Sequence, residues 1–233
     1  MNKIVSASIL PQTLPDNPMH HAKLWFDDAC LRKNQPNPNA MTLVTVSKNN
    51  QPSARIVLCK SFIADPGYVV FFTNYQSRKS SEITHNSNVS LVFHWDHLGR
   101  QIRIEGKAIL ASPEESDTYY KTRHIGSQLS AWGSDQSRPI ESREKLIEQM
   151  KQRADHLGFT IGDNEIIAKE ITNPLELSRP SHWGGIKIWA SKIELWMDGE
   201  DRVHDRAIWS RDLQPMDDNT FSTSKWIGTR LQP

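Results

Sequence analysis

The chain has only two cysteines, Cys30 and Cys59, among its 233 residues. Two thiols cannot form the disulfide framework that stabilises small secreted domains, so the sequence favours a reduced, cytoplasmic setting. No run of residues approaches the length of a membrane span, and the opening segment lacks the unbroken apolar core of a secretory signal. We therefore expect a soluble intracellular protein.

Net charge is low as well. The 28 Lys and Arg residues are opposed by 27 Asp and Glu residues, which leaves a formal charge of +1. A chain so close to neutrality has no global field that would draw it onto nucleic acid or an anionic membrane. Any recognition of an anion must depend on local groups of cations.

Several motifs of common enzyme classes are absent. The sequence has no Gly-rich phosphate loop, no G-x-S-x-G elbow and no dinucleotide fingerprint, which argues against a Rossmann dehydrogenase. Its nine histidines do not have metal-ligand spacing. His20 and His21 are adjacent on a predicted helix, while His94 and His97 lack a Cys or carboxylate companion. We expect no metal site.

The apolar pattern predicts a mainly β protein with peripheral helices, an α+β fold. Five strand-like runs lie within residues 41–110, with a short helix after the third. A parallel sheet would need a crossover helix after each strand, so tight turns indicate an antiparallel barrel or meander. Strands return after Trp183-Gly184-Gly185, and Asp198-Gly199 predicts a hairpin there.

The stretch around which the other elements are organised is residues 53–80. The runs Arg55–Lys60 and Tyr68–Thr73 flank Asp65-Pro66-Gly67, whose turn chemistry predicts a hairpin. The second run leads to Ser77-Arg78-Lys79 at the start of the short helix. Free backbone N–H groups and two cations at that point could hold a phosphate, although a solvated basic turn is the alternative interpretation.

Helices are predicted on either side of these strands. Asp16-Asn17-Pro18 supplies an N-cap and a proline at the first helical position. A capping box at residues 112–115 starts a second helix, and a third, amphipathic helix extends from Pro139 to about His156. The apolar residues expected to share one face of the first helix are Leu24, Trp25, Ala29 and Leu31.

The remaining segments show little periodicity. Residues 1–15 are expected to form a mobile arm, and residues 157–181 a long connection. The length of the chain suits a single domain over residues 1–233.

Two groups of cations could bind an anion. Tyr119 and Arg123, four residues apart on a predicted helix, share a face that Ser127 would extend. This trio suits a phosphate monoester, although ordinary helix surfaces often show the same pattern. A second group would converge only if the strands close into a barrel, and would otherwise face solvent; it comprises Arg55, Lys60, Arg78, Lys79, Arg100 and Arg103.

A third group follows from strand alternation. Arg202, His204 and Arg206 lie two residues apart on a predicted strand and would therefore point to the same side. Three basic groups in a row repel one another, so they require an anionic ligand or a buried carboxylate.

The order of these motifs resembles that of the pyridoxamine 5′-phosphate oxidase family. From about Asn39 onwards, segments follow in family order: NAMTLVTV, RIVLCK, FFTNYQSRK, RQIRIEG, EESDTYYKTRHIGSQLSAW, SDQSRPIESR, HWGG, IELW, RVHDR and RLQP. The resemblance implies an FMN-binding split β-barrel of antiparallel, Greek-key type. It also implies a homodimer with FMN at the subunit interface, in which strands of residues 180–233 complete the barrel and the dimer contact.

The implied activity is that of an FMN-dependent oxidase, a pyridoxal 5′-phosphate synthase. Such an enzyme converts pyridoxamine or pyridoxine 5′-phosphate to pyridoxal 5′-phosphate in vitamin B6 biosynthesis and salvage, with O2 as acceptor and release of H2O2. The implied FMN contacts are Arg55, Ile56, Val57, Leu58, Cys59, Lys60, Phe72, Thr73, Arg78, Lys79, Gln101, Gln136, Ser137, Trp196 and Arg206. The implied substrate and catalytic residues are Lys60, Tyr119, Arg123, Ser127, Arg202 and His204.

Two other interpretations remain open. One is an FMN oxidase of phenazine-type biosynthesis, which acts on a larger tricyclic substrate; the other is a flavin- or haem-binding split-barrel protein without turnover. The presence of Tyr119, Arg123, Ser127 and the RVHDR segment argues for a phosphorylated pyridine. The chain departs from the family at His124, where proline is common.

Overall fold

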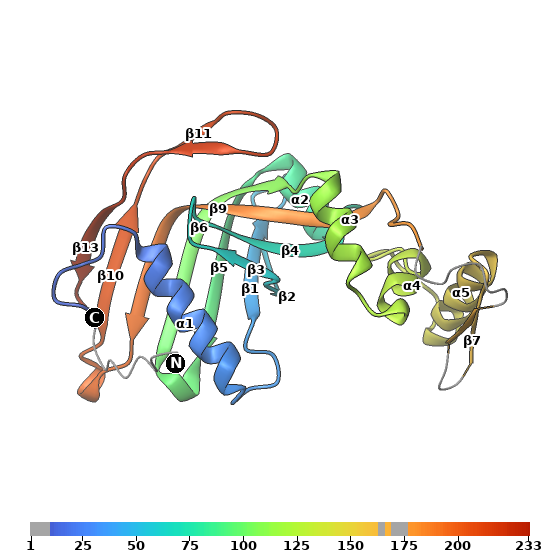
Figure 1. The fold of residues 1–233 in the computed structure, drawn as a ribbon, viewed down its shortest axis with the longest axis horizontal. Helices are drawn as coiled ribbons and strands as arrows, with labels where there is room; N and C mark the ends of the chain where they lie inside the picture. Colours follow the sequence, from blue (N-terminus) through green and yellow to red (C-terminus); the bar gives the residue numbers. More distant parts are fainter. Residues whose placement is uncertain (1–9, 163–165, 169–176) are drawn as a thin grey trace. The chain divides into compact units, whose positions relative to one another are not determined.

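The computed structural model describes residues 10–162, 166–168 and 177–233 (Figure 1). The chain divides into two compact units. The barrel unit comprises residues 1–71, 82–110 and 186–233, and the helical unit comprises residues 72–81 and 111–185. The prediction of a single domain over residues 1–233 stays a prediction.

An antiparallel sheet forms the barrel unit and curls into a half-barrel (Figure 1). Short strand β3 (Ser61–Ile63) pairs with β4 (Tyr68–Asn74), which also pairs with β9. The main strand order is β13 (Ile227–Leu231), β10 (Asp205–Ser210), β9 (Trp183–Met197), β6 (Arg100–Leu110), β5 (Asn88–Trp95), β1 (Ala40–Val46) and β2 (Pro52–Leu58). The predicted mainly β fold with peripheral helices is confirmed.

The core lies between this sheet and helix α1 (Pro18–Arg32), which crosses one sheet face in Figure 1. Period-two alternation buries every second side chain of β1 and β6. The Phe26 ring of α1 contacts those of Phe62 and Phe93, with centroids 5.4 and 5.6 Å away. The fully buried strand residues include Leu43, Leu91, Phe93, Ile102, Ile104, Ile193 and Leu195.

The start of α1 was predicted correctly, and so were Trp25 and Ala29 on its buried face, but Leu24 and Leu31 do not belong to that face. Asn17 is the N-cap, and its side chain accepts a hydrogen bond from the Met19 N–H at 2.9 Å. Leu24 and Leu31 are 51% and 65% exposed. They lie opposite the stripe that meets the sheet, because at 3.6 residues per turn that stripe contains Met19, Ala22, Trp25 and Ala29.

Strand pairing differs from the predicted hairpin. Strand β2 pairs with β1 over its whole length, and Ser61 of β3 lies opposite Val70 of β4. The prediction that the Arg55–Lys60 run pairs with the Tyr68–Thr73 run is therefore wrong, although the turn between them is correctly placed. A three-residue strand such as β3 is too short to show a periodic pattern.

Strands β6 and β9 pair along most of their length, with one shift of register at Glu105/Gly106. A Cβ atom on Gly106 would lie 1.9 Å from the Trp189 carbonyl oxygen, so only glycine allows the backbones to approach so closely here. Beyond this bulge the register places Gln101 opposite Trp196 and Arg103 opposite Glu194.

Residues 10–15 are packed against the barrel unit. Leu10 is 1% exposed, and its N–H donates to Asp205 Oδ2 at 2.6 Å. The Trp209 indole donates to the Pro15 carbonyl at 2.9 Å. The expectation of a mobile arm is therefore wrong for residues 10–15, because these contacts fix the backbone; residues 1–9 lie outside the described residues.

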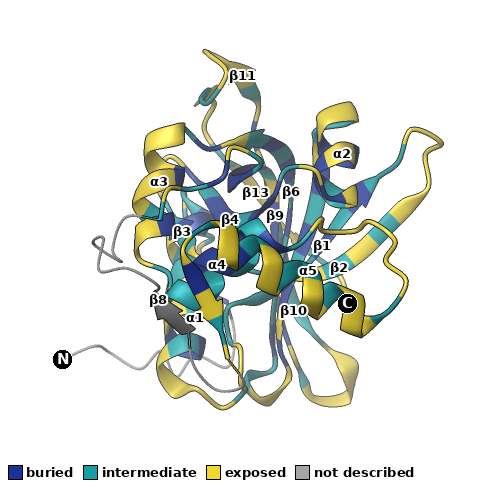
Figure 2. Ribbon diagram, turned by 90° about the vertical axis from the view of Figure 1, so that its right-hand side faces the viewer, coloured by how far each residue is buried: buried dark blue, intermediate teal, exposed yellow. Residues whose placement is uncertain are grey.

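The helical unit contains helices α3 (Pro113–Lys121), α4 (Ile125–Gly133) and α5 (Arg143–His156), and α2 (Arg78–His85) begins in it. The predicted capping box is present: the Glu115 N–H donates to Ser112 Oγ at 3.2 Å, and the Ser112 N–H donates to Glu115 Oε2 at 2.9 Å. Figure 2 shows the exposed outer side of α3.

Two helical-unit predictions need correction, and one helix was missed. Helix α5 begins at Arg143, capped by Ser142, and not at Pro139. Helix α4 was not predicted. The segment 157–181 is not one long connection, because β7 (Phe159–Ile161) pairs with β8 (Ile166–Ala168) within it.

No helix among the described residues is long and apolar enough to cross a membrane.

Arg211 holds a turn of the barrel unit from the inside. The side chain is 9% exposed, and its Nε, Nη1 and Nη2 donate to the carbonyls of Ala190, Pro66 and Gly67 at 2.8, 2.6 and 3.0 Å. Burial lowers the pKa of Arg211 to about 10. Gly67 has φ +102°, and a Cβ there would lie 2.7 Å from Arg211 Nη2.

We expect Arg211→Ala to lower the free energy of unfolding by about 2–4 kcal/mol, because three carbonyls, two of them in buried hydrogen bonds, lose their donor and a cavity remains. Urea denaturation measures the change. The exposed turn residue Lys48 provides the control, and Lys48→Ala should stay within about 0.5 kcal/mol of wild type. Equal stability of the two variants would contradict this role of Arg211.

Candidate functional site

A group of polar side chains gathers at the start of α2 in the helical unit. Lys79 Nζ donates to Thr73 Oγ1, Ser77 Oγ and Gln136 Oε1 at 2.9, 3.0 and 2.8 Å. Thr73 Oγ1 also donates to Gln136 Oε1 at 3.1 Å. The structure thus brings together three predicted FMN residues, Thr73, Lys79 and Gln136. An ammonium, two hydroxyls and a helix N-terminus suit a phosphate group.

The segment that carries Gln136 is held by an ion pair from α5. Arg153 Nη1 and Nη2 donate to Asp135 Oδ1 and Oδ2 at 2.9 and 2.8 Å, and Nη1 donates to the Trp132 carbonyl at 3.2 Å. The hydrogen bond from Arg153 lowers the pKa of Asp135. Ser137, also a predicted FMN residue, has a left-handed backbone with φ +71°.

An aromatic stack lies elsewhere in the helical unit. The rings of Phe72 and Tyr119 are 3.8 Å apart and nearly parallel, and Trp183 is 5.6 Å from Phe72. The Arg123 guanidinium lies over Trp183 at 4.4 Å. Arg123 Nη1 is buried without a hydrogen-bond partner in the described part of the chain, and burial lowers the pKa of Arg123. An unsatisfied buried donor is costly, and an anionic ligand would satisfy it.

Tyr119, Arg123 and Ser127 do not share one helix, so the predicted reason for their grouping is wrong. Helix α3 ends at Lys121, Arg123 lies in the connection, and Ser127 belongs to the first turn of α4. The chain breaks here because His124 caps α4: its Nδ1 accepts a hydrogen bond from the Gly126 N–H at 3.2 Å.

Four predicted residues come together in the barrel unit. Gln101 on β6, Trp196 on β9 and Arg206 on β10 lie in one row across three adjacent strands. The His204 ring lies 4.7 Å from the ring of Trp196. An amide, an aromatic plane, an imidazole and a guanidinium therefore line one end of these strands.

Arg202, His204 and Arg206 do not alternate along a strand as predicted. Strand β10 begins only at Asp205, whereas Arg202 ends the short 3-10 turn η2 (Glu200–Arg202) with φ +65°. His204 Nδ1 lies 3.1 Å from Asp198 Oδ1. The hairpin predicted at Asp198-Gly199 is present, but its loop includes the residues that were expected to be extended.

The Arg55–Lys60 segment lies at the end of the strand order, where β2 has one neighbour. The Arg55 guanidinium donates to Thr45 Oγ1 at 2.6 Å and forms an ion pair with Glu82 at 3.2 Å. The next residues vary in exposure. Ile56 is 63% exposed, Val57 and Leu58 are half-buried, Cys59 is buried, which raises the pKa of its thiol to about 12, and Lys60 is exposed.

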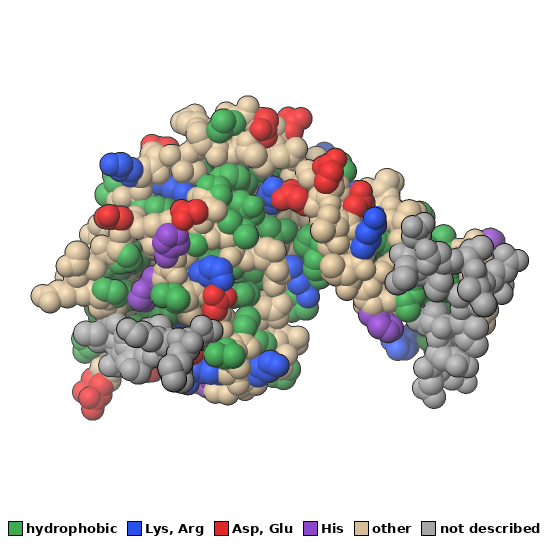
Figure 3. All heavy atoms as spheres, in the orientation of Figure 1, with side chains coloured by type: hydrophobic (Ala, Val, Ile, Leu, Met, Phe, Trp, Pro, Cys, Tyr) green, Lys and Arg blue, Asp and Glu red, His purple; other side chains and the backbone are tan. Residues whose placement is uncertain are grey.

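Sequence reasoning missed the carboxylates that hold the predicted arginines. Glu82 pairs with Arg55, and Glu194 pairs with Arg206 at 2.8 Å. A signal for Glu194 was present, because a charged residue inside the apolar run of the IELW segment needs a partner. Acidic and basic side chains are interspersed on the coloured surface of Figure 3.

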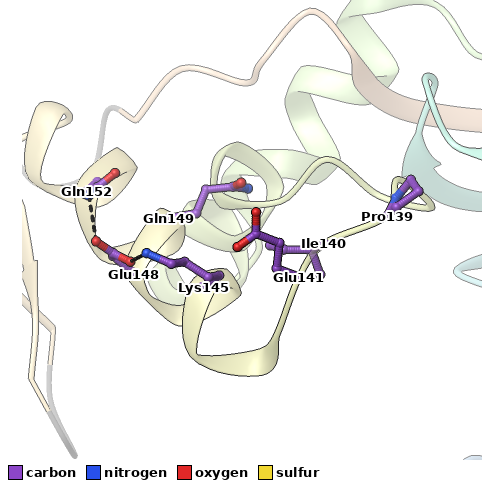
Figure 4. A pocket seen from close by; sticks show the side chains of 7 residues that line it. All are labelled: Pro139, Ile140, Glu141, Lys145, Glu148, Gln149 and Gln152. Atoms are coloured by element: carbon purple, nitrogen blue, oxygen red, sulfur yellow. Dashed lines mark hydrogen bonds and ion pairs between the residues drawn. The ribbon is translucent and has the colours of Figure 1, made fainter.

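A hollow of about 600 Å³ lies beside α5 and contains no predicted site residue. Lys145 and Glu148, which line it, are paired with each other at 2.8 Å (Figure 4). The other lining residues are Pro139, Ile140, Glu141, Gln149 and Gln152.

Across the described residues, no three His, Cys, Asp or Glu side chains gather as a metal site would require.

Two family models match most of the chain. The model described as "Pyridoxamine 5′-phosphate oxidase" matches residues 28–155, and "Pyridoxine 5′-phosphate oxidase C-terminal dimerisation region" matches residues 183–233. Proteins named pyridoxine/pyridoxamine 5′-phosphate oxidase from Burkholderia mallei, Burkholderia pseudomallei and Burkholderia thailandensis are 41% identical over 227 residues. The match covers 97% of this chain and 94% of each relative.

Solved structures give the same fold. PhzG from Burkholderia lata 383, solved in complex with tetrahydrophenazine-1-carboxylic acid, is 25% identical with a TM-score of 0.74 over 94% of each chain. A pyridoxamine 5′-phosphate oxidase-related, FMN binding protein from Nostoc punctiforme is 13% identical with a TM-score of 0.64. It covers 95% of this chain and 100% of its own, and shows the fold alone. The predicted split-barrel fold is confirmed.

We expect Arg153→Met to raise amide hydrogen exchange in residues 133–138 by about tenfold, because the segment loses its ion pair. Arg153 lowers the pKa of Asp135. The pair is therefore complete at neutral pH and is lost only as the pH falls through that lowered pKa. Lys145→Met, on the exposed side of the same helix, is the control. If amide exchange in residues 133–138 is unchanged in Arg153→Met, the ion pair does not hold this segment.

Proposed function

Because the chain belongs to the pyridoxamine 5′-phosphate oxidase family, a family of oxidoreductases, we propose that it oxidises pyridoxamine 5′-phosphate or pyridoxine 5′-phosphate to pyridoxal 5′-phosphate. Dioxygen is the acceptor and hydrogen peroxide the second product. The observation that carries the proposal is Arg123, a half-buried side chain beside Tyr119 whose Nη1 is buried without a hydrogen-bond partner in the described part of the chain. Both substrates bring the phosphate that such a group requires.

Each unit carries side chains of the kinds that FMN requires. In the helical unit, Lys79 with the Thr73 and Ser77 hydroxyls suits a phosphate. In the barrel unit, the row of Gln101, Trp196 and Arg206 suits a planar ring with polar edges. When bound, FMN supplies the two-electron acceptor that the substrate carbon needs and that dioxygen reoxidises. The remaining proposed contacts are Arg55, Ile56, Val57, Leu58, Cys59, Lys60, Phe72, Arg78, Gln136 and Ser137.

The other proposed residues act on the substrate. Arg123, Tyr119, Ser127 and Lys60 hold its phosphate and ring substituents, as the residue types allow. Arg202 and His204 orient the carbon that bears the amine or alcohol. Orientation of this kind can supply several kcal/mol of the barrier reduction, provided that the reacting atoms are held at contact distance.

The likeness to PhzG favours a second candidate, oxidation of a tricyclic phenazine precursor. The ligand named in that structure is a carboxylic acid and has no phosphate. The buried, unsatisfied Nη1 of Arg123 and the phosphate-type donors around Lys79 support the phosphorylated pyridine more strongly. Assay of both substrate types on one preparation separates the candidates.

We also propose a cytoplasmic homodimer. The C-terminal match is to a dimerisation region. Large apolar side chains in that region are exposed, with Val203 at 71%, Met216 at 69% and Ile227 at 76%. Burial of such residues by a second copy would remove them from water. Free thiols at Cys30 and Cys59 support the reduced compartment.

The test of the proposed function is the purified protein, loaded with FMN, in air-saturated buffer. Release of peroxide and appearance of the 4′-aldehyde absorbance with pyridoxamine or pyridoxine 5′-phosphate are expected. FMN binding without turnover of either would overturn the proposal. Turnover of a tricyclic carboxylic acid alone would establish the second candidate.

We expect Arg202→Ala to lower kcat/KM by about 100-fold or more, because the substrate carbon loses its orientation. FMN binding should remain, since Arg202 is assigned to the substrate. The neighbouring exposed Glu200 offers the control variant Glu200→Gln, with near wild-type kinetics. Loss of flavin colour in Arg202→Ala would contradict the assignment.

Arg123→Met should raise KM for the phosphorylated substrate by about 10- to 100-fold, because charge-assisted hydrogen bonds contribute about 1.5–3 kcal/mol. The Met side chain preserves packing over Trp183, so we expect the FMN dissociation constant to stay unchanged. Steady-state kinetics and flavin titration measure the two effects. Arg138→Met at an exposed position is the control, and an unchanged KM in Arg123→Met would remove this residue from the site.

A further inference from the structure

The Glu194 carboxylate is buried between two guanidiniums in the barrel unit. Its side chain is 3% exposed. Oε1 accepts hydrogen bonds from Arg206 Nε and Nη2 at 3.0 and 2.8 Å. Arg103 Nη2 lies 2.6 Å from Oε2, as an ion pair without hydrogen-bond alignment. A buried carboxylate requires partners, and these two arginines supply them for Glu194.

Glu194 is the buried member of a series of alternating charges on one face of the sheet. Beyond it, Arg103 lies 3.9 Å from Glu105, and Glu105 lies 3.6 Å from Lys192. The register fixes these neighbours, with Arg103 opposite Glu194 and Glu105 opposite Lys192. The next residues along each strand, such as Ile104 and Ile193, are fully buried in the core. The charged side chains therefore cannot turn to the other face.

Arg206 keeps donors for a ligand after these contacts. Of the five N–H groups of a guanidinium, Nε and Nη2 use one each on Glu194, and Nη1 uses one on the Gln232 carbonyl at 3.1 Å. Two N–H groups remain by this count within the described residues. Two guanidiniums and one carboxylate leave one net positive charge, with Arg206 held beside Trp196 in its row.

We propose that Glu194 is a positioning residue for the redox site: it fixes the direction of the Arg206 guanidinium and limits the charge that the site presents to FMN. The inference rests on the proposed function, since it takes FMN as the ligand. It adds a residue that the proposed contacts do not include and assigns its effect to charge. A buried ion pair that served only the fold would stabilise the chain without any effect on the flavin.

Glu194→Gln tests the charge directly. The amide oxygen of Gln can still accept a hydrogen bond from Arg206, but the negative charge of the carboxylate is lost. Reduced FMN carries more negative charge than oxidised FMN. The substitution should therefore strengthen binding of reduced FMN relative to oxidised FMN. We expect the affinity for reduced FMN divided by that for oxidised FMN to rise about tenfold. Equilibration with a redox dye measures this change as a higher midpoint potential of the bound flavin. Arg103→Met removes a positive charge from a side chain that is 39% exposed, and should shift the potential in the opposite direction.

Two comparisons separate positioning from folding. Glu105→Gln changes a charge of the same series without contact to Arg206, and should leave the potential at the wild-type value. In an Arg206→Met background, Glu194→Gln should shift the potential less than in wild type, because the part of the effect that acts through the direction of Arg206 is lost and only the charge remains. Thermal unfolding of each variant reports the purely structural contribution.

A lower melting temperature of Glu194→Gln with an unchanged potential would overturn the proposal, as would additive effects of Glu194→Gln and Arg206→Met. Should Glu194→Gln fail to fold, a potential for Arg103→Met equal to that of wild type would overturn it equally. Wild-type protein that binds FMN without oxidising the pyridine substrates would refute the proposed function while leaving this inference testable on the flavin. Wild-type protein that binds no FMN would overturn both.

Discussion

The pairing of β6 with β9 is the constraint on which the barrel unit depends. One bulge at Gly106 sets the register. With that register, apolar side chains point into the core and polar ones to the other face, where Gln101 meets Trp196. A slip by one residue would exchange the two faces and bury every charge of the series. The row of proposed ligand residues is therefore a consequence of how two strands pair, and not of any local motif.

A nearly neutral chain can still present strong local cations, because its arginines are held in different ways. Arg206 and Arg55 are paired with Glu194 and Glu82, which fixes direction and reduces charge. Arg123 lies against an aromatic ring and has a buried, unsatisfied N–H. Only this last environment leaves a full charge without a carboxylate beside it. Paired arginines thus offer a ligand directed N–H groups with reduced charge, whereas Arg123 offers an uncompensated charge.

Local signals in the sequence predicted local structure well. The Asn17 cap and the Ser112 capping box were found because their side-chain chemistry acts within four residues. Strand positions followed from periodicity, and the family resemblance supplied the barrel. The placement of Arg202 failed, because a positive φ is not visible in residue type when the residue is not glycine. The need for a buried carboxylate or an anionic ligand beside Arg206 was predicted, but Glu194 could not be assigned to it, since its partners come from neighbouring strands.

The cap at His124 sets the start of α4. Its Nδ1 accepts a hydrogen bond from the Gly126 N–H, which satisfies one of the donors that a helix start leaves unpaired. A side chain without an acceptor at this position would leave that donor unpaired and weaken the first turn, which carries Ser127. The position of a proposed substrate residue therefore depends on a side chain that the substrate itself need not touch.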